Sequence, residues 1–484
     1  MKVCIVGGGS AGWMTATTFI RSLDSDITLI ESPNIPTSGV GESTLGGIQD
    51  WIRLVGIGAD ELSFIKETNG TIKHSIKFTN FLKKDSGSFH YPFGKIDCEP
   101  EYWWSLYMHG MDEIFGDISF NDYALDVNHV ALLAERGKIN MEDIHAYHFD
   151  AIKFGQYLRK AYCKEVNHIK ANVIGYEKQN ENIKNIKLDN GNTIEADLFI
   201  DCTGFASKLL GEFLNEPFIS YNDKLPNDSA WATHIPHVNK KKMRPYTECT
   251  AINNGWVWNI PLWDSIGTGY VYSSKHISHE DAKQEFINHL GTDDCEFKHI
   301  PMRIGRHKRS WVGNVVAIGL SAGFIEPLES NGLLTVHNNL IDLYKTLRRG
   351  KPSKLLRDYY NYNTSLKFDE MIDFITIHYA FTQREDTPYW KDIFNKSYDL
   401  GNSEKYGLLA YSTELYKYSL FHYPLKGFNY IASGMGVCAY SMPSQNLKSC
   451  MEIKDINKKW EESIKKLPTM YEYLKKNVYN SPGI

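Results

Sequence analysis

Three glycines near the N-terminus have the spacing of a phosphate-binding turn. Gly7, Gly9 and Gly12 follow a short β-branched run and open a helical pattern that starts at Ser10. In a strand–turn–helix unit the first glycine permits the tight turn, the second lets a pyrophosphate approach the backbone, and the third lets the helix pack on the strand. The positive end of the helix dipole attracts phosphate. We therefore predict a dinucleotide site in which Ser10 and Ala11 take part with the three glycines.

A carboxylate farther along the chain extends this site. Glu31 ends a second β-branched run, 19 residues after Gly12. A carboxylate at this place accepts hydrogen bonds from the adenosine ribose hydroxyls and repels a 2′-phosphate, which disfavours NADP. The apolar run 198–200 leads into Thr203-Gly204, as in many FAD-binding oxidoreductases, and the chain has no second complete G-x-G-x-x-G for a pyridine nucleotide. The sequence thus favours FAD, without a separate NAD(P)H domain.

The elements that position this site are not contiguous in the sequence. Four strand patterns belong to one sheet, and the segments between them must leave it and return; they lie near residues 3, 27, 198 and 315. Residues 183–198 predict a hairpin with a tight turn at Asn190-Gly191, and residues 246–273 alternate as strands. A mainly helical pattern runs from about residue 327 to the end.

We therefore predict an α/β fold (α+β overall). It combines a doubly wound, Rossmann-like FAD-binding domain of the glutathione-reductase type with an inserted β-sheet and a mainly helical C-terminal region. The predicted parts are 1–50, 147–210 and 290–345 for the discontinuous FAD domain, 51–146 and 211–289 for the inserted sheet and substrate region, and 346–484 for the helical region.

Composition excludes several classes of partner. Lys plus Arg is 53 and Asp plus Glu is 58, so the net charge of −5 lacks the basic excess that nucleic-acid binding needs. No apolar run approaches the roughly 18 residues of a membrane span, and no signal peptide is evident. The 8 cysteines are scattered, without a C-x-x-C pair. We expect a cytoplasmic protein, monomeric or homo-oligomeric, with no metal. The pair His145 and His148 lacks the partners of a metal site.

Six motifs, taken together, resemble the flavin-dependent halogenases of the tryptophan-halogenase family along nearly the whole chain. The most specific is W-x-W-x-I-P, because a chance match to it is far rarer than one to the glycine motif. The motifs are Gly7 to Trp13, Val40 to Thr44, His148-Phe149-Asp150, Ile200 to Phe205, Gly255 to Pro261, and Phe324 to Ser330.

The resemblance implies a reaction and its central residues. Reduced FAD from a separate flavin reductase reacts with oxygen to a flavin hydroperoxide, which a halide near Asn331 and Gly332 attacks. The hypohalous acid passes through an internal tunnel to Lys73, which delivers the electrophilic halogen to an aromatic carbon. Glu329 stabilises the cationic ring and takes its proton, as a carboxylate beside a developing cation can.

The resemblance also assigns surrounding residues. Trp256 and Trp258 would wall off the flavin face and keep the organic substrate from it. His90 and Phe93 would line the substrate pocket. Further cofactor contacts are implied in a loop over the flavin and after a later strand: Gly41, Glu42, Ser43, Gly319 and Leu320.

Each of these assignments has an alternative. By residue type alone Lys73 would be a solvated surface lysine, and Lys77 is its rival. Glu329 could interact with a helix dipole, and Glu326 competes for the role of base. The two tryptophans share one strand face and could be ordinary core, and His90 with Phe93 could belong to a structural aromatic cluster.

Substrate and activity stay open in three respects. The aromatic clamp of members acting on free tryptophan does not align, 421–429 being the nearest region, so we expect a small indole-like aromatic without preference among halides. A single-component aromatic hydroxylase is one alternative, although Gly319 to Gly323 lacks the Asp usual in such enzymes. A non-catalytic FAD-binding protein is the other.

Overall fold

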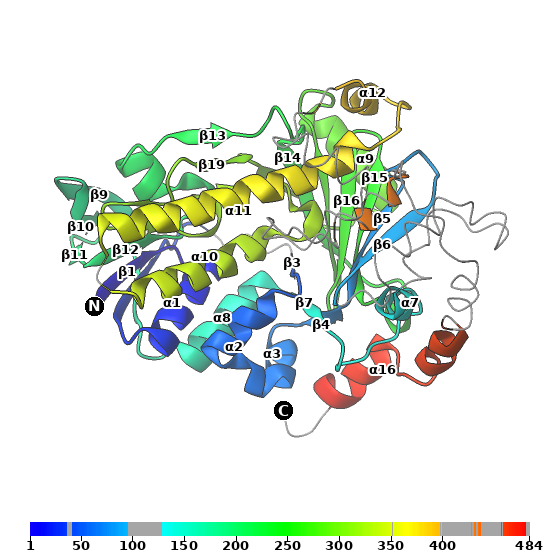
Figure 1. Cartoon of the computed structure of the whole chain (residues 1–484), viewed down its shortest axis with the longest axis horizontal. Helices are drawn as coiled ribbons and strands as arrows, with labels where there is room; N and C mark the ends of the chain where they lie inside the picture. The colour runs from blue at the N-terminus through cyan, green and yellow to red at the C-terminus, as the bar shows by residue number, and fades with distance from the viewer. Residues whose placement is uncertain are drawn as a thin grey trace, which may run out of the picture.

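The protein, analysed as a computed structural model, is elongated, with a parallel sheet at one end and a larger antiparallel sheet at the other (Figure 1). Helix α11 (Lys354–Ala380) runs along the molecule between the two ends. The structure describes residues 1–35, 41–94, 128–350, 352–396, 398, 427, 430–431, 434–436, 456 and 458–480.

The parallel sheet carries the glycine turn. Five of its strands are parallel and the edge strand β20 is antiparallel. Val3 and Ile5 of β1 pack toward helices α1 and α8, whereas Cys4 and Val6 pack on the opposite face, because successive side chains of a strand alternate. The order is β20 (Trp311–Val312), β21 (Val315–Ala317), β12 (Leu198–Asp201), β1 (Lys2–Val6), β2 (Asp26–Glu31) and β8 (Asn167–Lys170).

An antiparallel three-stranded sheet covers the face of the parallel sheet that Cys4 and Val6 line. It consists of β9 (Val173–Gln179), β10 (Asn182–Leu188) and β11 (Thr193–Glu195). Strands β10 and β11 form the predicted hairpin, and Gly191 takes a φ of +84° in its turn. That part of the sequence prediction is confirmed.

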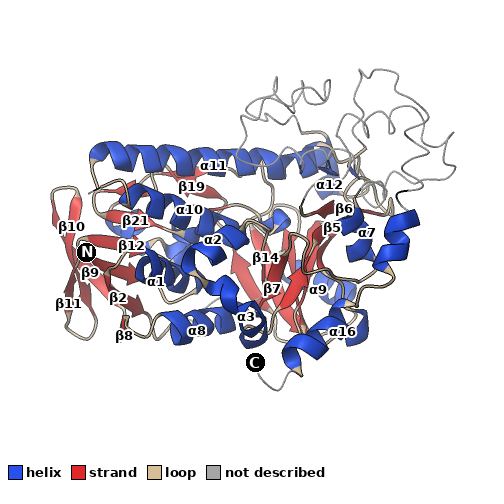
Figure 2. Ribbon diagram, turned by 60° about the horizontal axis from the view of Figure 1, so that its bottom comes forward, coloured by secondary structure: helices blue, strands red, loops and turns tan. Residues whose placement is uncertain are grey.

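The larger sheet has seven strands. Its strands β14, β5 and β6 lie at the other end of the molecule from β1 and β12 (Figure 2). Its pairs are antiparallel except β15 with β5, which is parallel. The strands predicted within 246–273 are confirmed as β15, β16 and β17. The order is β18 (Lys298–Pro301), β14 (Ser229–Ile235), β17 (Ile266–Tyr272), β16 (Gly255–Pro261), β15 (Tyr246–Ile252), β5 (Ser75–Thr79) and β6 (Ser88–Pro92). Since β18 lies here, we propose to end the inserted region after Pro301 rather than at residue 289.

Two small sheets link the ends. The first joins β3 (Glu42–Ser43), β7 (Ala146–Phe149) and β4 (Thr71–Lys73), so strands far apart in sequence lie side by side. The second joins β13 (Phe218–Ser220), β19 (Gly305–His307) and β22 (Gly323–Phe324).

Helices pack around these sheets, and the fold is a mixed α/β fold as predicted. The helices described after residue 327 agree with the predicted helical C-terminal pattern. Besides α11, the α-helices with bounds in the described part of the chain are α1 (Ser10–Ser22), α2 (Ile48–Val55), α3 (Glu61–Glu67), α7 (His129–Glu135), α8 (Ala151–Tyr162), α9 (His279–Leu290), α10 (Gly332–Leu347), α12 (Pro388–Phe394) and α16 (Met470–Leu474). Across the described ranges, none of the helices combines the length and apolarity required to span a lipid bilayer.

Candidate active site

The glycine turn between β1 and α1 has the geometry that a pyrophosphate requires. Gly7 takes a φ of +116°, and a Cβ there would lie 2.1 Å from the carbonyl oxygen of Cys202. A Cβ on Gly12 would lie 1.9 Å from the carbonyl oxygen of Gly7. Gly9 precedes α1 without a side-chain cap, and the first turn holds no acidic residue. The helix start therefore offers N–H groups and a positive dipole end to an anion, and these residues fit a bound dinucleotide.

Glu31 lies against the same turn. A Cβ on Gly8 would be 2.5 Å from Cγ of Glu31. His168 Nε2 is 2.7 Å from Oε2 of Glu31, and among the described residues Oε1 has no hydrogen-bond partner. One carboxylate oxygen thus remains for a ribose hydroxyl, which agrees with the predicted role.

The later cofactor residues lie beside the start of α1. Gly319 takes a φ of +69°, and a Cβ there would be 3.2 Å from Cβ of Ala11. Leu320 belongs to the same short 3₁₀ turn, Gly319–Ser321. The structure therefore brings together two predicted cofactor segments that are more than 300 residues apart in the sequence.

A methyl group at Gly12 should remove cofactor binding. In Gly12→Ala the new Cβ must displace the Gly7 carbonyl, so we expect FAD affinity to fall by at least about 100-fold and stability to fall by roughly 1–3 kcal/mol. Flavin fluorescence titration and urea unfolding measure both effects. Gly175→Ala is the matched control, because no atom lies within 4 Å of its Cβ position. Wild-type affinity in the Gly12 variant would refute the assignment.

The segment 41–43 connects the cofactor end with the start of α10. Oε2 of Glu42 lies 4.0 Å from the position of a Cβ on Gly332. Burial raises the pKa of the Glu42 carboxyl to about 7. Gly41 takes a φ of +81° and lies near Gly267 of β17. Residues 36–40, with Val40 of the motif, lie outside the described residues.

The start of α10 is suited to a small anion. Asn331 precedes the helix, is 1% exposed, and does not cap it with its side chain. Its Nδ2 donates to the carbonyl oxygen of Glu326 at 3.1 Å, while its Oδ1 has no partner among the described residues. The 16-residue helix directs its positive end to Asn331 and Gly332. These are the residues predicted to hold the halide.

Lys73 is buried and is not the surface lysine that its residue type suggests. Its side chain is 0% exposed, and Nζ donates to Ser43 Oγ at 2.9 Å and to Ser330 Oγ at 2.7 Å. Desolvation lowers the pKa of the Lys73 amine to about 7, against the opposing influence of Cys249 and Glu329. A fraction of the Lys73 amines is therefore neutral near pH 7.

The rival lysine lies in a different environment. Lys77 is partly exposed and forms an ion pair of 3.0 Å with Glu135 on α7. Its donors are engaged by the two carboxylate oxygens of Glu135. The geometry therefore favours Lys73 as the reactive amine.

The two candidate carboxylates have different partners. Glu329 is fully buried and faces His378 Nε2 at 2.8 Å. Burial raises the pKa of Glu329, against the opposing influence of its hydrogen bond with His378 and of the nearby Lys73. Glu326 instead accepts hydrogen bonds from Trp256 and Tyr379. Glu329 thus acts electrostatically on Lys73, whereas Glu326 fixes an aromatic wall.

The predicted tryptophans are both buried in the large core. Trp256 is 0% and Trp258 8% exposed, and their ring centroids are 6.1 Å apart. Trp256 is held by Glu326 on its indole N–H, while Trp258 Nε1 has no partner in the described part of the chain. The shared position of the two tryptophans on one face of β16 is compatible with both interpretations, a wall of the flavin pocket and ordinary core packing.

The two predicted pocket residues separate in the structure. The Phe93 ring centroid is 5.2 Å from Lys73 Nζ, so this residue does border the candidate site. His90 is buried and faces Ser75 Oγ at 2.9 Å and Glu135 at 2.9 Å. His90 therefore belongs to the polar cluster around Lys77. The region 421–429 lies outside the described residues apart from Gly427.

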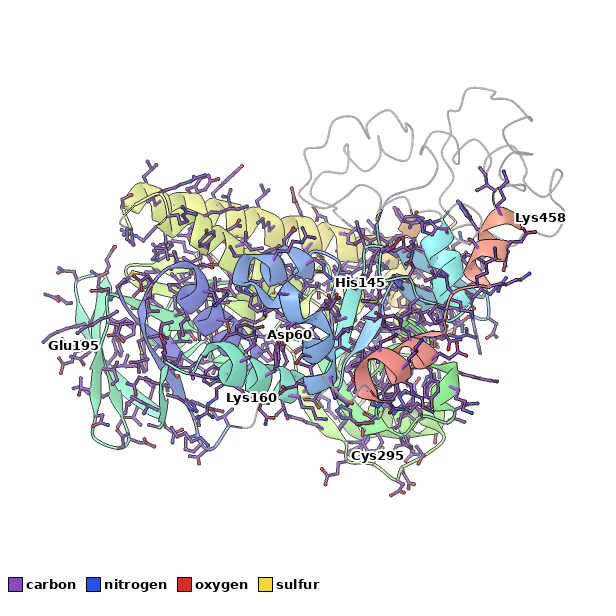
Figure 3. All side chains as sticks on the ribbon, turned by 90° about the horizontal axis from the view of Figure 1, so that it is seen from below. Asp60, His145, Lys160, Glu195, Cys295 and Lys458 are labelled. Carbon is purple, nitrogen blue, oxygen red and sulfur yellow. The ribbon has the colours of Figure 1, made fainter. Side chains whose placement is uncertain are left out.

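The histidine pair does not act together. His145 Nε2 lies 2.8 Å from Oε1 of Glu61, and Figure 3 labels His145. His148 instead bonds to Thr71 and Thr247. Over the described residues, no cluster of three His, Cys, Asp or Glu side chains is arranged to hold a metal ion.

Sequence reasoning missed four residues around Lys73. Ser330 directly follows Glu329 and is the last residue of the motif Phe324 to Ser330, so the motif could have identified it. Thr247 and His378 come from β15 and α11, and no spacing in the sequence relates them to Lys73. His148 belongs to one of the family motifs, but its residue type suggested no role other than metal binding.

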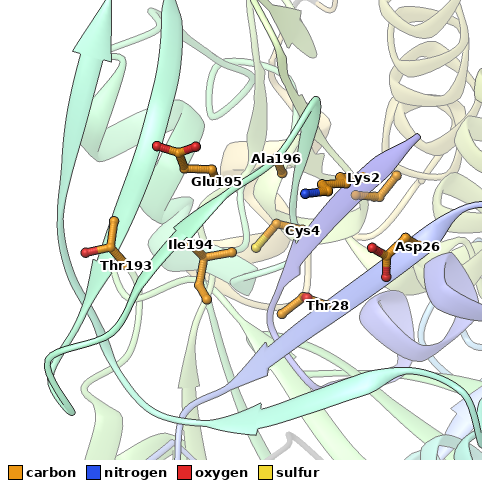
Figure 4. A pocket seen from close by; sticks show the side chains of 9 residues that line it. Lys2, Cys4, Asp26, Thr28, Thr193, Ile194, Glu195 and Ala196 are labelled. Carbon is orange, nitrogen blue, oxygen red and sulfur yellow. The ribbon is translucent and has the colours of Figure 1, made fainter.

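A separate cavity of about 200 Å³ lies between β11 and the first residues of β1 and β2 (Figure 4). It is lined in part by Lys2, Asp26 and Glu195. These residues stand at the end of β1 opposite the glycine turn. The cavity is therefore not part of the candidate active site.

Comparisons with known proteins match this chain over most of its length. The family model for tryptophan halogenase matches residues 2–449. Tryptophan 7-halogenase RebH of Lentzea aerocolonigenes is 35% identical over 420 residues, which cover 81% of this chain and 78% of that protein. The apo structure of VirX1 is 38% identical, with a TM-score of 0.88 over 99% of both chains.

Tar14, a tryptophan C-6 flavin-dependent halogenase (chlorinase) from taromycin biosynthesis, superposes with a TM-score of 0.90 at 31% identity, over 98% of this chain and 99% of that one. The match thus extends over nearly the full length of the chain in both sequence and fold. The chain belongs to the tryptophan halogenase family of flavin-dependent enzymes.

Proposed function

We propose that this chain catalyses the FADH2-dependent halogenation of a small, indole-like aromatic substrate with O2 and a halide ion. The observation that carries the proposal is the position of Lys73, buried between two serines. Ser43 follows the predicted cofactor residue Glu42, and Ser330 precedes the predicted halide residue Asn331. The Lys73 amine thus contacts one residue next to the predicted cofactor site and one residue next to the predicted halide site.

Membership of a flavin-dependent family implies FAD, and we propose that the glycine turn, Glu31 and the Gly319 turn hold it in a domain of the glutathione-reductase type. When bound, reduced FAD supplies with O2 the oxidation that converts halide to hypohalous acid. The chain offers one complete dinucleotide motif, so a separate flavin reductase would supply the reduced cofactor.

Lys73 would receive the oxidised halogen. A neutral amine attacks hypohalous acid to form an N–halogen bond with loss of water, and a protonated amine polarises the acid by donating to its oxygen. Since burial lowers the pKa of Lys73 to about 7, both forms are present at neutral pH. The halogen is then passed to an aromatic carbon, and the passage that brings the acid to Lys73 is part of this proposal.

Glu329 would act on the substrate ring. Attack of the ring on the electrophilic halogen leaves a cation, which a nearby carboxylate stabilises and then deprotonates. His378 Nδ1 faces the carbonyl oxygens of Phe374 and Ile375 at 3.2 Å, so this nitrogen carries a proton. One further proton therefore lies between His378 Nε2 and Glu329, and His378 orients the carboxyl group.

A direct assay tests the proposed function. The purified protein is incubated with FAD, NADH, a flavin reductase and each of chloride, bromide and iodide, against a panel of indoles and other small aromatics. Mass spectrometry should detect a product heavier by one halogen, and only with the reductase present. Oxygenated product, or NADPH oxidation by the protein alone, would favour an aromatic hydroxylase. The absence of any product would favour a non-catalytic FAD-binding protein.

Halide binding should weaken as the pH rises through about 7. Below its pKa of about 7 the Glu42 carboxyl is neutral, and above it a negative charge lies close to the start of α10. We expect the halide KM to rise about three- to tenfold between about pH 6 and pH 8. In Glu42→Gln most of this rise should disappear, and what remains is due to Lys73. An equal rise in both proteins would exclude Glu42.

A further inference from the structure

A chain of buried polar side chains begins at Lys73 and ends at a backbone carbonyl. Lys73 Nζ lies 2.9 Å from Ser43 Oγ, and Ser43 Oγ lies 2.6 Å from Thr247 Oγ1. Thr247 Oγ1 lies 2.9 Å from His148 Nε2, and His148 Nδ1 lies 3.0 Å from Thr71 Oγ1. Thr71 Oγ1 is 2.5 Å from the carbonyl oxygen of the last residue of β16.

The small sheet β3–β7–β4 supplies every side chain of this chain except Thr247, which comes from β15. In its register Ser43 lies opposite His148, and His148 lies opposite Thr71. Thr71 and Lys73 are two residues apart on β4 and so point to the same face. All are at most 8% exposed, so bulk solvent has little access to these hydrogen bonds. The chain is therefore a product of strand pairing and joins segments distant in sequence.

The end of the chain fixes the direction of every hydrogen bond. The carbonyl oxygen of Pro261 can only accept, so the Thr71 hydroxyl donates to it. The Thr71 oxygen then accepts from His148 Nδ1–H. Burial, with the nearby Lys73 charge, holds the pKa of His148 well below its ordinary value, so the imidazole is neutral and Nε2 accepts from Thr247. Thr247 in turn accepts from the Ser43 hydroxyl.

This direction decides what Lys73 can do. The Ser43 proton is committed to Thr247, so Ser43 can only accept from the amine. Lys73 Nζ donates to Ser43 Oγ at 2.9 Å and to Ser330 Oγ at 2.7 Å, and the chain directs the Ser43 proton away from the amine. When a neutral amine makes both donations, its lone pair points in a third direction, away from the Ser43 hydroxyl. A Ser43 hydroxyl that was free to turn would instead donate to this lone pair and block it.

We infer that His148, Thr247 and Thr71 are positioning residues, which lock the Ser43 hydroxyl away from Lys73 so that the amine lone pair stays open to the halogen. The inference rests on the function proposed above. It gives a role to His148 of the H-F-D motif, which the reaction itself does not use.

The first test reads the tautomer of His148 without any cofactor. In protein labelled with 15N in its histidine rings, NMR should show His148 neutral and protonated on Nδ1 between about pH 6 and 9, which is the less common tautomer. The signals of His148 are assigned by their loss in His148→Gln. If His148→Gln does not fold, they are assigned as the histidine signals that change in Thr247→Val. An Nε2–H tautomer, or an imidazolium, would overturn the inference.

The second test removes one hydroxyl while keeping its shape. In Thr247→Val the Ser43 hydroxyl is released, and we expect kcat for halogenation to fall at least about tenfold with little change in the substrate KM. Thr247→Ser should restore most of the loss. Thr71→Val, which removes the last donor, should have the same effect as Thr247→Val and carries the test if the latter does not fold.

The pH profile separates positioning from mere structural support. The titratable groups that face Lys73 are Cys249 on β15, His148 on β7 and Glu329, and Thr247→Val leaves them in place. Because the released hydroxyl stabilises the neutral amine, the Lys73 midpoint in the kcat profile should move to lower pH.

A control variant defines the outcome. Thr233→Val removes a buried hydroxyl from β14, where it donates to the backbone carbonyl oxygen of Glu296 at 2.7 Å, and should leave the midpoint unchanged. A Thr247 variant with a normal midpoint and kcat would overturn the inference. If the wild-type protein forms no halogenated product, the proposed function fails, while the NMR result still decides on the hydrogen-bond chain.

Discussion

Replacing Lys73 with methionine or alanine removes halogenated product while FAD binding persists. The amine is the group that carries or polarises the halogen, and neither replacement has a donor or a lone pair on nitrogen, so we expect a loss of at least about 1,000-fold in product formation. Product is measured by mass spectrometry and FAD binding by fluorescence. Lys77→Met is the matched control and should keep activity, since Lys77 is paired with Glu135. Turnover retained in the Lys73 variants would reject the assignment.

The methionine variant should also be more stable than the wild-type protein near pH 7. Burial lowers the pKa of Lys73 from its ordinary value of 10.5 to about 7. Between these values the unfolded state binds more protons, so the free energy of unfolding of the wild-type protein rises with pH through this window. Removing the buried amine should raise it by about 1–4 kcal/mol at pH 7, and by less near pH 10. If the wild-type protein and Lys73→Met had equal urea midpoints at both pH values, the Lys73 amine would be solvent-exposed.

Replacing Glu329 with glutamine should slow halogenation about 100- to 1,000-fold. The amide keeps the shape and the contact with His378, but it cannot take a proton or stabilise a cation with a full charge. We expect the loss in kcat, with the substrate KM and FAD affinity almost unchanged, and steady-state kinetics measures all three.

The neighbouring carboxylate provides the control. Glu326→Gln retains partners for Trp256 and Tyr379 and should alter stability more than kcat, because Glu326 fixes the indole ring of Trp256. A normal rate in Glu329→Gln with a slow Glu326→Gln would exchange the two roles. Normal rates in both would leave the reaction without a carboxylate base.

The nucleotide end of the molecule could be predicted from local pattern. The turn that starts at Gly7 is set by residues within one strand–helix unit, and its short contacts leave no room for a side chain. The hairpin at Gly191 was predictable for the same reason, since its left-handed backbone conformation is a local property.

The reactive centre could not be predicted in this way. The pattern around Lys73 resembles that of a surface lysine, and its burial comes from the pairing of β4 with β7 and from Ser43 on β3. The choice between Glu329 and Glu326 depends on His378 and Tyr379, which belong to a helix that begins more than 20 residues later. A resemblance to a family identified Lys73, and three-dimensional contacts identified what surrounds it.

The most direct test of the central claim separates the formation of the oxidant from its delivery. Wild-type protein and Lys73→Met are supplied with a flavin reductase, FAD, NADH and halide, and two products are measured in parallel: the halogenated aromatic substrate and a small scavenger that reacts with any hypohalous acid released into solution. If Lys73 delivers the halogen, the wild-type protein halogenates its substrate, and the variant halogenates only the scavenger. Substrate halogenation by the variant, or loss of both products, would contradict the account.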